Sequence, residues 1–97
     1  MKQIEFIISG ETSEELADEL IIVYNKWRKN PGSLNGKNKK KRLTIRVCIT
    51  GIRRETSIEH CIRYACGEIR DGIIQAGGTI WDGTHVQIML YENRWKI

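Results

Sequence analysis

The sequence has no apolar run that approaches the roughly 20 residues needed to cross a bilayer. The apolar stretch in its opening residues, MKQIEFIISG, is too short for a signal peptide and lacks a cleavage-site pattern. Its three cysteines are odd in number and irregularly spaced, which is typical of reduced thiols in a cytosolic protein. The lack of a membrane span and of a signal peptide, together with the cysteine pattern, predicts a cytoplasmic protein with no membrane partner. If the chain is viral, the host cytoplasm is meant.

The motifs of common catalytic and metal sites are also missing. No Gly-x-Ser-x-Gly, Walker loop, His-Glu-x-x-His motif or acidic metal cluster is present. Cys61 and Cys66 are too far apart along a helix to share a face, and His60 and Cys66 lie about 120° apart around it. A nucleophilic pair of Cys48 with His85 across a sheet stays open, because alternation does not place it. We therefore expect no enzyme, no metal and no cofactor.

A chain of 97 residues with 40% hydrophobic and 29% charged residues is typical of one soluble globular domain, here residues 1–97. Its net charge of +4 is unevenly distributed: residues 5–19 hold six acids and no base, whereas residues 26–42 hold eight bases and no acid. Such separation creates a local positive field that favours anionic partners. The glycines and lysines of residues 31–42 predict a flexible basic loop.

Each predicted helix begins at a capping box, Thr12–Glu15 for the first helix and Thr56–Glu59 for the second. The first helix is expected to end near Asn30, because the proline that follows disfavours helical geometry in the residue before it. The second helix is expected to continue to the pair Gly77-Gly78, where the glycines stop it.

Alternating apolar and polar residues predict strands over 2–9 and 43–50, and a hairpin around the two-residue turn Asp82-Gly83. The order is β-α-β-α-β-β, so we expect an α+β fold in two layers, with both helices on one face of a four-stranded sheet. The helix-covered face should carry Ile4, Phe6, Ile8, Ile45, Val47, Ile49, Val86, Ile88 and Leu90. The other face is a mixed one with Glu5, Ile7, Thr44, Arg46, Cys48, His85, Gln87, Met89 and Tyr91, and is expected to meet a partner or a second copy.

This element order is similar to that of Alba-type chromatin proteins and of the C-terminal domain of a bacterial initiation factor. The resemblance is one of topology over most of the chain, with no shared motif, so it carries no residue roles across. It implies a small basic nucleic-acid binder and, for the Alba type, a homodimer.

The two strand–helix turns contain the same Glu-Thr-Ser-x-Glu letters after a glycine, but the second turn has three additional residues, Ile52, Arg53 and Arg54. The two arginines precede the second helix, where unpaired backbone amides and the helix dipole favour anions. Guanidinium groups add bidentate donors, so the turn is a candidate phosphate site. The alternative is a solvated turn in which Glu55 neutralises one arginine.

Further candidate contacts lie in the basic loop and on the open sheet face. The loop lysines and arginine suit phosphate backbones without sequence readout, although a solubilising loop is the alternative. Arg46 and Tyr91 offer a charge and a stacking ring, or else make ordinary cross-strand pairs. The loop residues concerned are Lys39, Lys40, Lys41 and Arg42, with Lys37 nearby.

The sequence therefore predicts a non-catalytic, homodimeric binding protein for a phosphate-rich partner, first of all nucleic acid. The alternative is a small phage or mobile-element anti-defence protein that sequesters a nucleotide signal or blocks a host defence enzyme. A third interpretation is an interaction module that uses the mixed sheet face and leaves both arginines idle.

Overall fold

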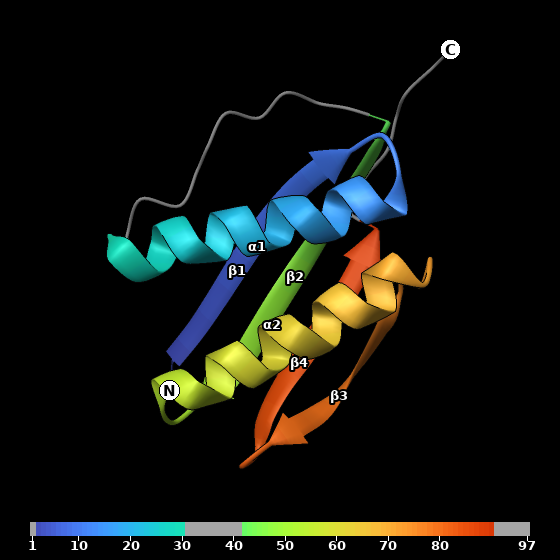
Figure 1. Cartoon of the computed structure of the whole chain (residues 1–97). Coiled ribbons are helices and arrows are strands. Elements are labelled where there is room, and N and C mark those ends of the chain that lie inside the picture. Colours follow the sequence, from blue (N-terminus) through green and yellow to red (C-terminus); the bar gives the residue numbers. More distant parts are fainter. Residues whose placement is uncertain (1, 31–41, 91–97) are drawn as a thin grey trace.

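The computed structural model describes residues 2–30 and 42–90, which form a four-stranded sheet covered on one face by two helices (Figure 1). The elements are β1 (Lys2–Gly10), α1 (Ser13–Lys29), β2 (Leu43–Ile52), α2 (Glu55–Arg70), β3 (Ala76–Trp81) and β4 (Thr84–Leu90). The predicted α+β class, the two layers and the element order are confirmed. Neither described helix is long and apolar enough to span a membrane.

The sheet is antiparallel throughout, in the order β1-β2-β4-β3. β1 pairs with β2 along its whole length, so that Gly10 lies opposite Leu43 at one end and Lys2 opposite Ile52 at the other. β3 and β4 are joined by the predicted two-residue turn, in which Asp82 and Gly83 have φ values of 53° and 81°. Positive φ at both positions gives a type I′ turn, whose twist matches the flanking strands.

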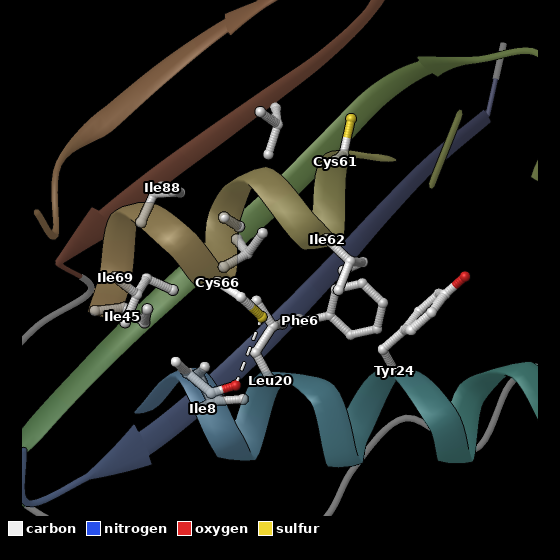
Figure 2. Close-up of a cluster of buried hydrophobic side chains, with 14 of the residues drawn as sticks. Phe6, Ile8, Leu20, Tyr24, Ile45, Cys61, Ile62, Cys66, Ile69 and Ile88 are labelled. Carbon is white, nitrogen blue, oxygen red and sulfur yellow. Dashed lines mark hydrogen bonds between the residues drawn. The ribbon is translucent and has the colours of Figure 1, made fainter. Parts of the chain in front are cut away.

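The core lies between the sheet and the helices, as the alternation predicts (Figure 2). The inward residues of β1, β2 and β4 are buried, and the helices add Leu16, Leu20, Ile62 and Ile69 to the same cluster. Two of the predicted core residues are exceptions: Ile4, near the beginning of β1, is only half-buried, and Leu90, at the end of β4, is 37% exposed. The opposite face of the sheet carries no described helix, so the described residues leave it open.

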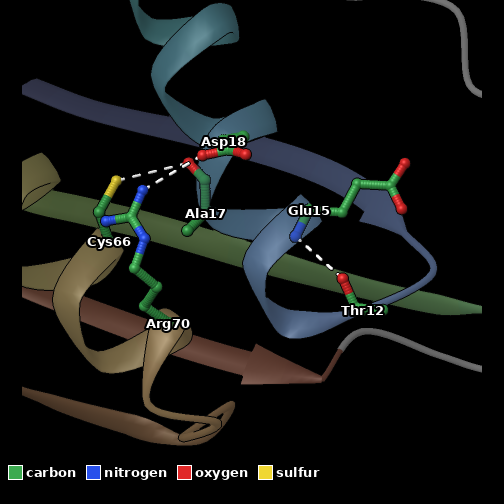
Figure 3. Close-up of polar contacts among 6 residues, drawn as sticks. All are labelled: Thr12, Glu15, Ala17, Asp18, Cys66 and Arg70. Atoms are coloured by element: carbon green, nitrogen blue, oxygen red, sulfur yellow. Dashed lines mark hydrogen bonds and ion pairs between the residues drawn. The ribbon is translucent and has the colours of Figure 1, made fainter.

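α1 and α2 pack side by side and run in opposite directions (Figure 1). Near one end of the pair, Arg70 of α2 donates to a carboxylate oxygen of Asp18 at 3.2 Å, and the Cys66 thiol donates to the Ala17 carbonyl at 3.6 Å (Figure 3). The antiparallel arrangement therefore places the carboxyl end of α1 and the amino end of α2 at the same end of the helical layer.

The carboxyl end of α2 differs from the prediction. The helix ends at Arg70, and the predicted stop, Gly77-Gly78, lies inside β3. Gly72 has φ 86°, and the amide of Ile73 donates to the carbonyl of Glu68 at 2.9 Å. This is a Schellman ending, in which a left-handed residue closes the last turn. Asp-Gly after the arginine was therefore the true stop signal.

Candidate nucleic-acid interface

The first strand–helix turn is closed by its own side chains. Thr12 is the N-cap of α1, and its hydroxyl accepts from the amide of Glu15 at 3.1 Å (Figure 3). The Glu15 carboxylate in turn accepts from the amide of Glu11 at 2.7 Å. The predicted capping box is confirmed, with the return bond going to the residue before the N-cap. Side chains thus satisfy two backbone donors at this turn.

The second turn is built differently, and the predicted capping box of Thr56 and Glu59 is wrong. α2 begins at Glu55, two residues earlier than predicted, with Arg54 as an extended N-cap whose side chain makes no capping bond. The three additional residues move Arg54 into the N-cap position and leave Thr56 inside the helix. Ser57 does not replace the cap, because its hydroxyl is fully buried and makes no hydrogen bond within the described structure.

Gly51 fixes the path of the chain into this turn. It has φ 70°, and its carbonyl accepts from the hydroxyl of the buried Thr84 at 3.2 Å. A Cβ placed on Gly51 would lie 3.0 Å from the carbonyl oxygen of Gly83, which is tighter than nine in ten Cβ contacts in proteins. The end of β2 is therefore held tightly against the β3–β4 turn, just before the two arginines.

Both arginines of the turn are exposed, and neither forms an ion pair within residues 2–30 and 42–90. The alternative in which Glu55 neutralises one of them is thus not observed. The guanidinium of Arg53 lies beside the hairpin turn, with two of its nitrogens 3.8 Å from the place of a Cβ on Gly83. Arg54 begins α2, where the helix dipole is positive. Two positive groups thus stand at an electropositive helix end.

The end of α1 adds further positive charge at the same end of the helical layer. Arg28 and Lys29 are exposed in its last turn, and the Arg28 guanidinium lies 5.7 Å from the centre of the Tyr24 ring. Burial raises the pKa of Tyr24; Arg28 opposes this rise, and carboxylates of α2 that include Glu55 add to it. Tyr24 therefore lies within electrostatic range of charged groups at the end of α1 and near the start of α2. We call Arg28, Lys29, Arg53 and Arg54 the basic end.

Arg42 lies far from the basic end. It precedes β2, whereas Arg53 follows it, so about 30 Å of strand separates them. Arg42 is exposed beside the turn where Gly10 leads into the acidic start of α1. The structure therefore does not bring all the predicted basic residues together. The predicted contacts Lys39, Lys40, Lys41 and Tyr91 lie outside the described residues.

Arg46 is held on the open sheet face by its neighbours. Its guanidinium lies 3.3 Å from a carboxylate oxygen of Glu5 on β1, and donates to the Met89 sulfur of β4 at 3.3 Å. These are the cross-strand contacts that the sequence left as the alternative to ligand binding. Because the acid and the base offset each other, the centre of this face has little net charge to offer a phosphate.

The three thiols lie in different surroundings: Cys61 and Cys66 are buried, and Cys48 is half-buried. Burial raises the pKa of Cys61 to about 11 and also raises that of Cys66, so both stay protonated at neutral pH. Cys48 on the open face lies opposite Gln87 in the register, two residues along β4 from His85. No group of three possible metal ligands occurs among the described residues.

Sequence reasoning missed the contribution of α1 to the basic end. Basic residues in the last turn of a helix are explained by its own dipole, so Arg28 and Lys29 carried no separate signal. Only the antiparallel packing of the helices places them at the same end of the helical layer as the start of α2. Comparison of the chain with known protein families, curated proteins and solved structures found no match.

Proposed function

We propose that this protein is a non-catalytic nucleic-acid binder that holds backbone phosphates at the basic end. The observation that carries the proposal is the start of α2, where Arg53 and Arg54 stand without an ion pair in the described structure. The N-cap side chain makes no capping bond, which leaves backbone amides for an anion. Arg28 and Lys29 add positive charge in the last turn of the neighbouring helix, at the same end of the helical layer.

The exposure of these side chains favours a polymer over a small nucleotide. Sites for small ligands are concave and bury most of the ligand surface, whereas all four groups of the basic end are exposed. Exposed arginines and lysines on a helix end instead suit successive phosphates along a strand, without reading the sequence. Arg46 is paired with Glu5 of the same chain and therefore adds no group on the sheet for reading bases. The expected binding is therefore salt-dependent and weakly sequence-selective.

The proposal is tested by the anisotropy of a fluorescent oligonucleotide titrated with protein at several salt concentrations. Replacing Arg53 and Arg54 together with alanine should weaken binding at least tenfold, which is about 1.4 kcal/mol. The slope of log affinity against log salt should fall by about 1.5 to 2, because two phosphate contacts are lost. The matched control replaces Arg63 and Arg70, which are on the same helix but paired with Glu59 and Asp18.

The outcomes separate the functional classes. A loss of binding and of salt slope in the first variant alone supports the proposal. Equal losses in both variants would mean that net charge, and not the basic end, attracts the oligonucleotide. Tight binding of a mononucleotide or dinucleotide, with little affinity for the oligonucleotide, would instead favour the nucleotide-sequestering alternative.

A further inference from the structure

Ser57 carries a buried hydroxyl group that has no partner in the described structure. It is the third residue of α2 and is fully buried, and its hydroxyl makes no hydrogen bond. A buried hydroxyl without a partner costs free energy, so proteins rarely keep one, and such a group indicates a partner outside the chain. Thr84, the other buried serine or threonine of the described residues, follows the usual rule and donates to the Gly51 carbonyl at 3.2 Å.

The equivalent position of α1 shows what a residue there does when it serves its own helix. Glu15 is the third residue of α1, and its carboxylate accepts from the Glu11 amide at 2.7 Å. In a helix each side chain tilts toward the amino end, so the hydroxyl of Ser57 is directed back toward the start of α2. The amide of Ser57 donates to the carbonyl of Arg54 at 3.0 Å, and the side chain of this N-cap residue makes no capping bond. The unpaired hydroxyl therefore belongs to the helix start that lacks a side-chain cap.

The exposed side of the same turn carries more donors than an internal phosphate of a nucleic acid can use. Arg53 and Arg54 bring two exposed guanidinium groups. The amides of Glu55 and Thr56 lie in the first turn of α2, where a helix provides no acceptor. The Glu55 carboxylate opposes an anion here, but two arginines and the helix dipole outweigh it.

The two kinds of phosphate in a nucleic acid differ in charge and in free oxygens. An internal phosphodiester has a single negative charge and two free oxygens. A terminal phosphate monoester has about 1.5 to 2 negative charges at neutral pH and three free oxygens. The donors gathered in one turn at the start of α2, with the Ser57 hydroxyl among them, therefore match a terminal phosphate better than an internal one.

We propose that the start of α2 binds the terminal phosphate of a nucleic-acid strand, and that Ser57 is the donor that favours this phosphate over internal ones. The inference rests on the proposed function and adds the end of the strand as the group that is recognised. Arg28 and Lys29, at the same end of the helical layer, are then available for the phosphates that follow. Because Ser57 is fully buried, the first turn has to open slightly before the hydroxyl can donate, and no side-chain cap holds that turn closed.

Three oligonucleotides of one sequence test the proposal by fluorescence anisotropy, each with the fluorophore inside the strand. One has a 5′-terminal phosphate, one a 3′-terminal phosphate and one has hydroxyls at both ends. At equal salt, one of the two phosphorylated strands should bind at least tenfold tighter than the unphosphorylated strand, which is the effect of one or two charge-assisted hydrogen bonds. A strand longer by one nucleotide is the control for added charge, and its gain should be less than about twofold.

Two variants test the part of Ser57 in this preference. Ser57→Ala should reduce the preference for the phosphorylated strand to within about threefold. It should also raise the melting temperature of the free protein, because it removes an unpaired buried hydroxyl. The matched control Cys61→Ala removes one buried atom about one turn further along α2. It should keep the preference and lower the melting temperature, because it leaves a small cavity.

The outcomes separate this inference from the proposed function. A preference that Ser57→Ala removes and Cys61→Ala keeps supports the inference. Equal affinity for all three strands, with binding that still weakens as salt rises, overturns it and leaves the proposed function standing. A preference that survives Ser57→Ala, or a lower melting temperature of that variant, also overturns it, because the hydroxyl then has no role or has another partner. Failure of all three strands to bind would contradict the proposed function, and this inference with it.

Discussion

The two strand–helix turns contain the same Glu-Thr-Ser-x-Glu motif, but they differ in how the backbone amides at the start of the following helix are bonded. At the first turn, Thr12 and Glu15 use their side chains to occupy backbone donors. At the second, the same letters are shifted into the helix and the N-cap is an arginine without a capping bond. Side chains of the first turn accept from its backbone amides, whereas the N-cap side chain of the second turn makes no such bond. The three additional residues of the second turn therefore go with a helix start whose N-cap side chain makes no capping bond.

The surrounding charges sharpen this contrast. The first turn is followed by Glu14 and Glu15, which complement the dipole of α1 and repel an incoming phosphate. The second turn carries Arg53 and Arg54, which add like charge to the positive end of α2 and are mildly unfavourable without an anion. The charges of the first turn thus stabilise its helix, whereas those of the second turn are the ones on which the proposed phosphate binding depends.

The largest expected effect is on the glycines that enter the two turns. Gly51→Ala should lower the free energy of unfolding by about 2–3 kcal/mol, because alanine is strained at positive φ and its Cβ would press on the Gly83 carbonyl. Gly10→Ala should cost about 1 kcal/mol, because its nearest neighbours include the flexible side chain of Glu15. Urea unfolding of both variants measures the difference; equal losses would mean that the two turns have the same backbone requirement.

The next largest effect is the loss of the cap. Thr12→Ala should destabilise the protein by about 1 kcal/mol, since it removes the acceptor for the Glu15 amide. Thr56→Ala, the matched change in the second copy of the motif, should change stability by less than about 0.5 kcal/mol, because Thr56 is exposed and is not the N-cap. Thermal unfolding of the pair tests this; a larger loss for Thr56→Ala would show that the second motif does cap its helix.

How far the sequence predicts this molecule depends on the range of the interactions concerned. Alternation in β2 and the Asp82-Gly83 turn are local, and both predictions are confirmed. The prediction for the start of α2 is wrong because the insertion changes which residue occupies the N-cap. The capping propensity of Thr56 alone does not reveal this change. Arg28 lies at the same end of the helical layer as the start of α2 only because the helices pack antiparallel, a long-range arrangement that no spacing in the sequence encodes.

The smallest expected effect comes from making the second turn resemble the first. Arg54→Asp supplies a side-chain acceptor at the N-cap and should stabilise the protein by about 0.5–1 kcal/mol. The same change should weaken oligonucleotide binding, because the new carboxylate occupies the donors that an anion would use. Arg53→Asp is the control: it makes the same charge change outside the N-cap and should not stabilise the helix. Chemical unfolding and anisotropy, measured on the same preparations, give both quantities.

The most direct measurement of the central claim is an NMR titration of the labelled protein with a short oligonucleotide, and with inorganic phosphate in parallel. The backbone amides of Glu55 and Thr56 at the start of α2 should shift with saturation, while those of Ser13 and Glu14 at the start of α1 should stay in place. Rising salt should reverse the oligonucleotide shifts. Equal shifts at both helix starts, or shifts confined to the open sheet face, would contradict the account.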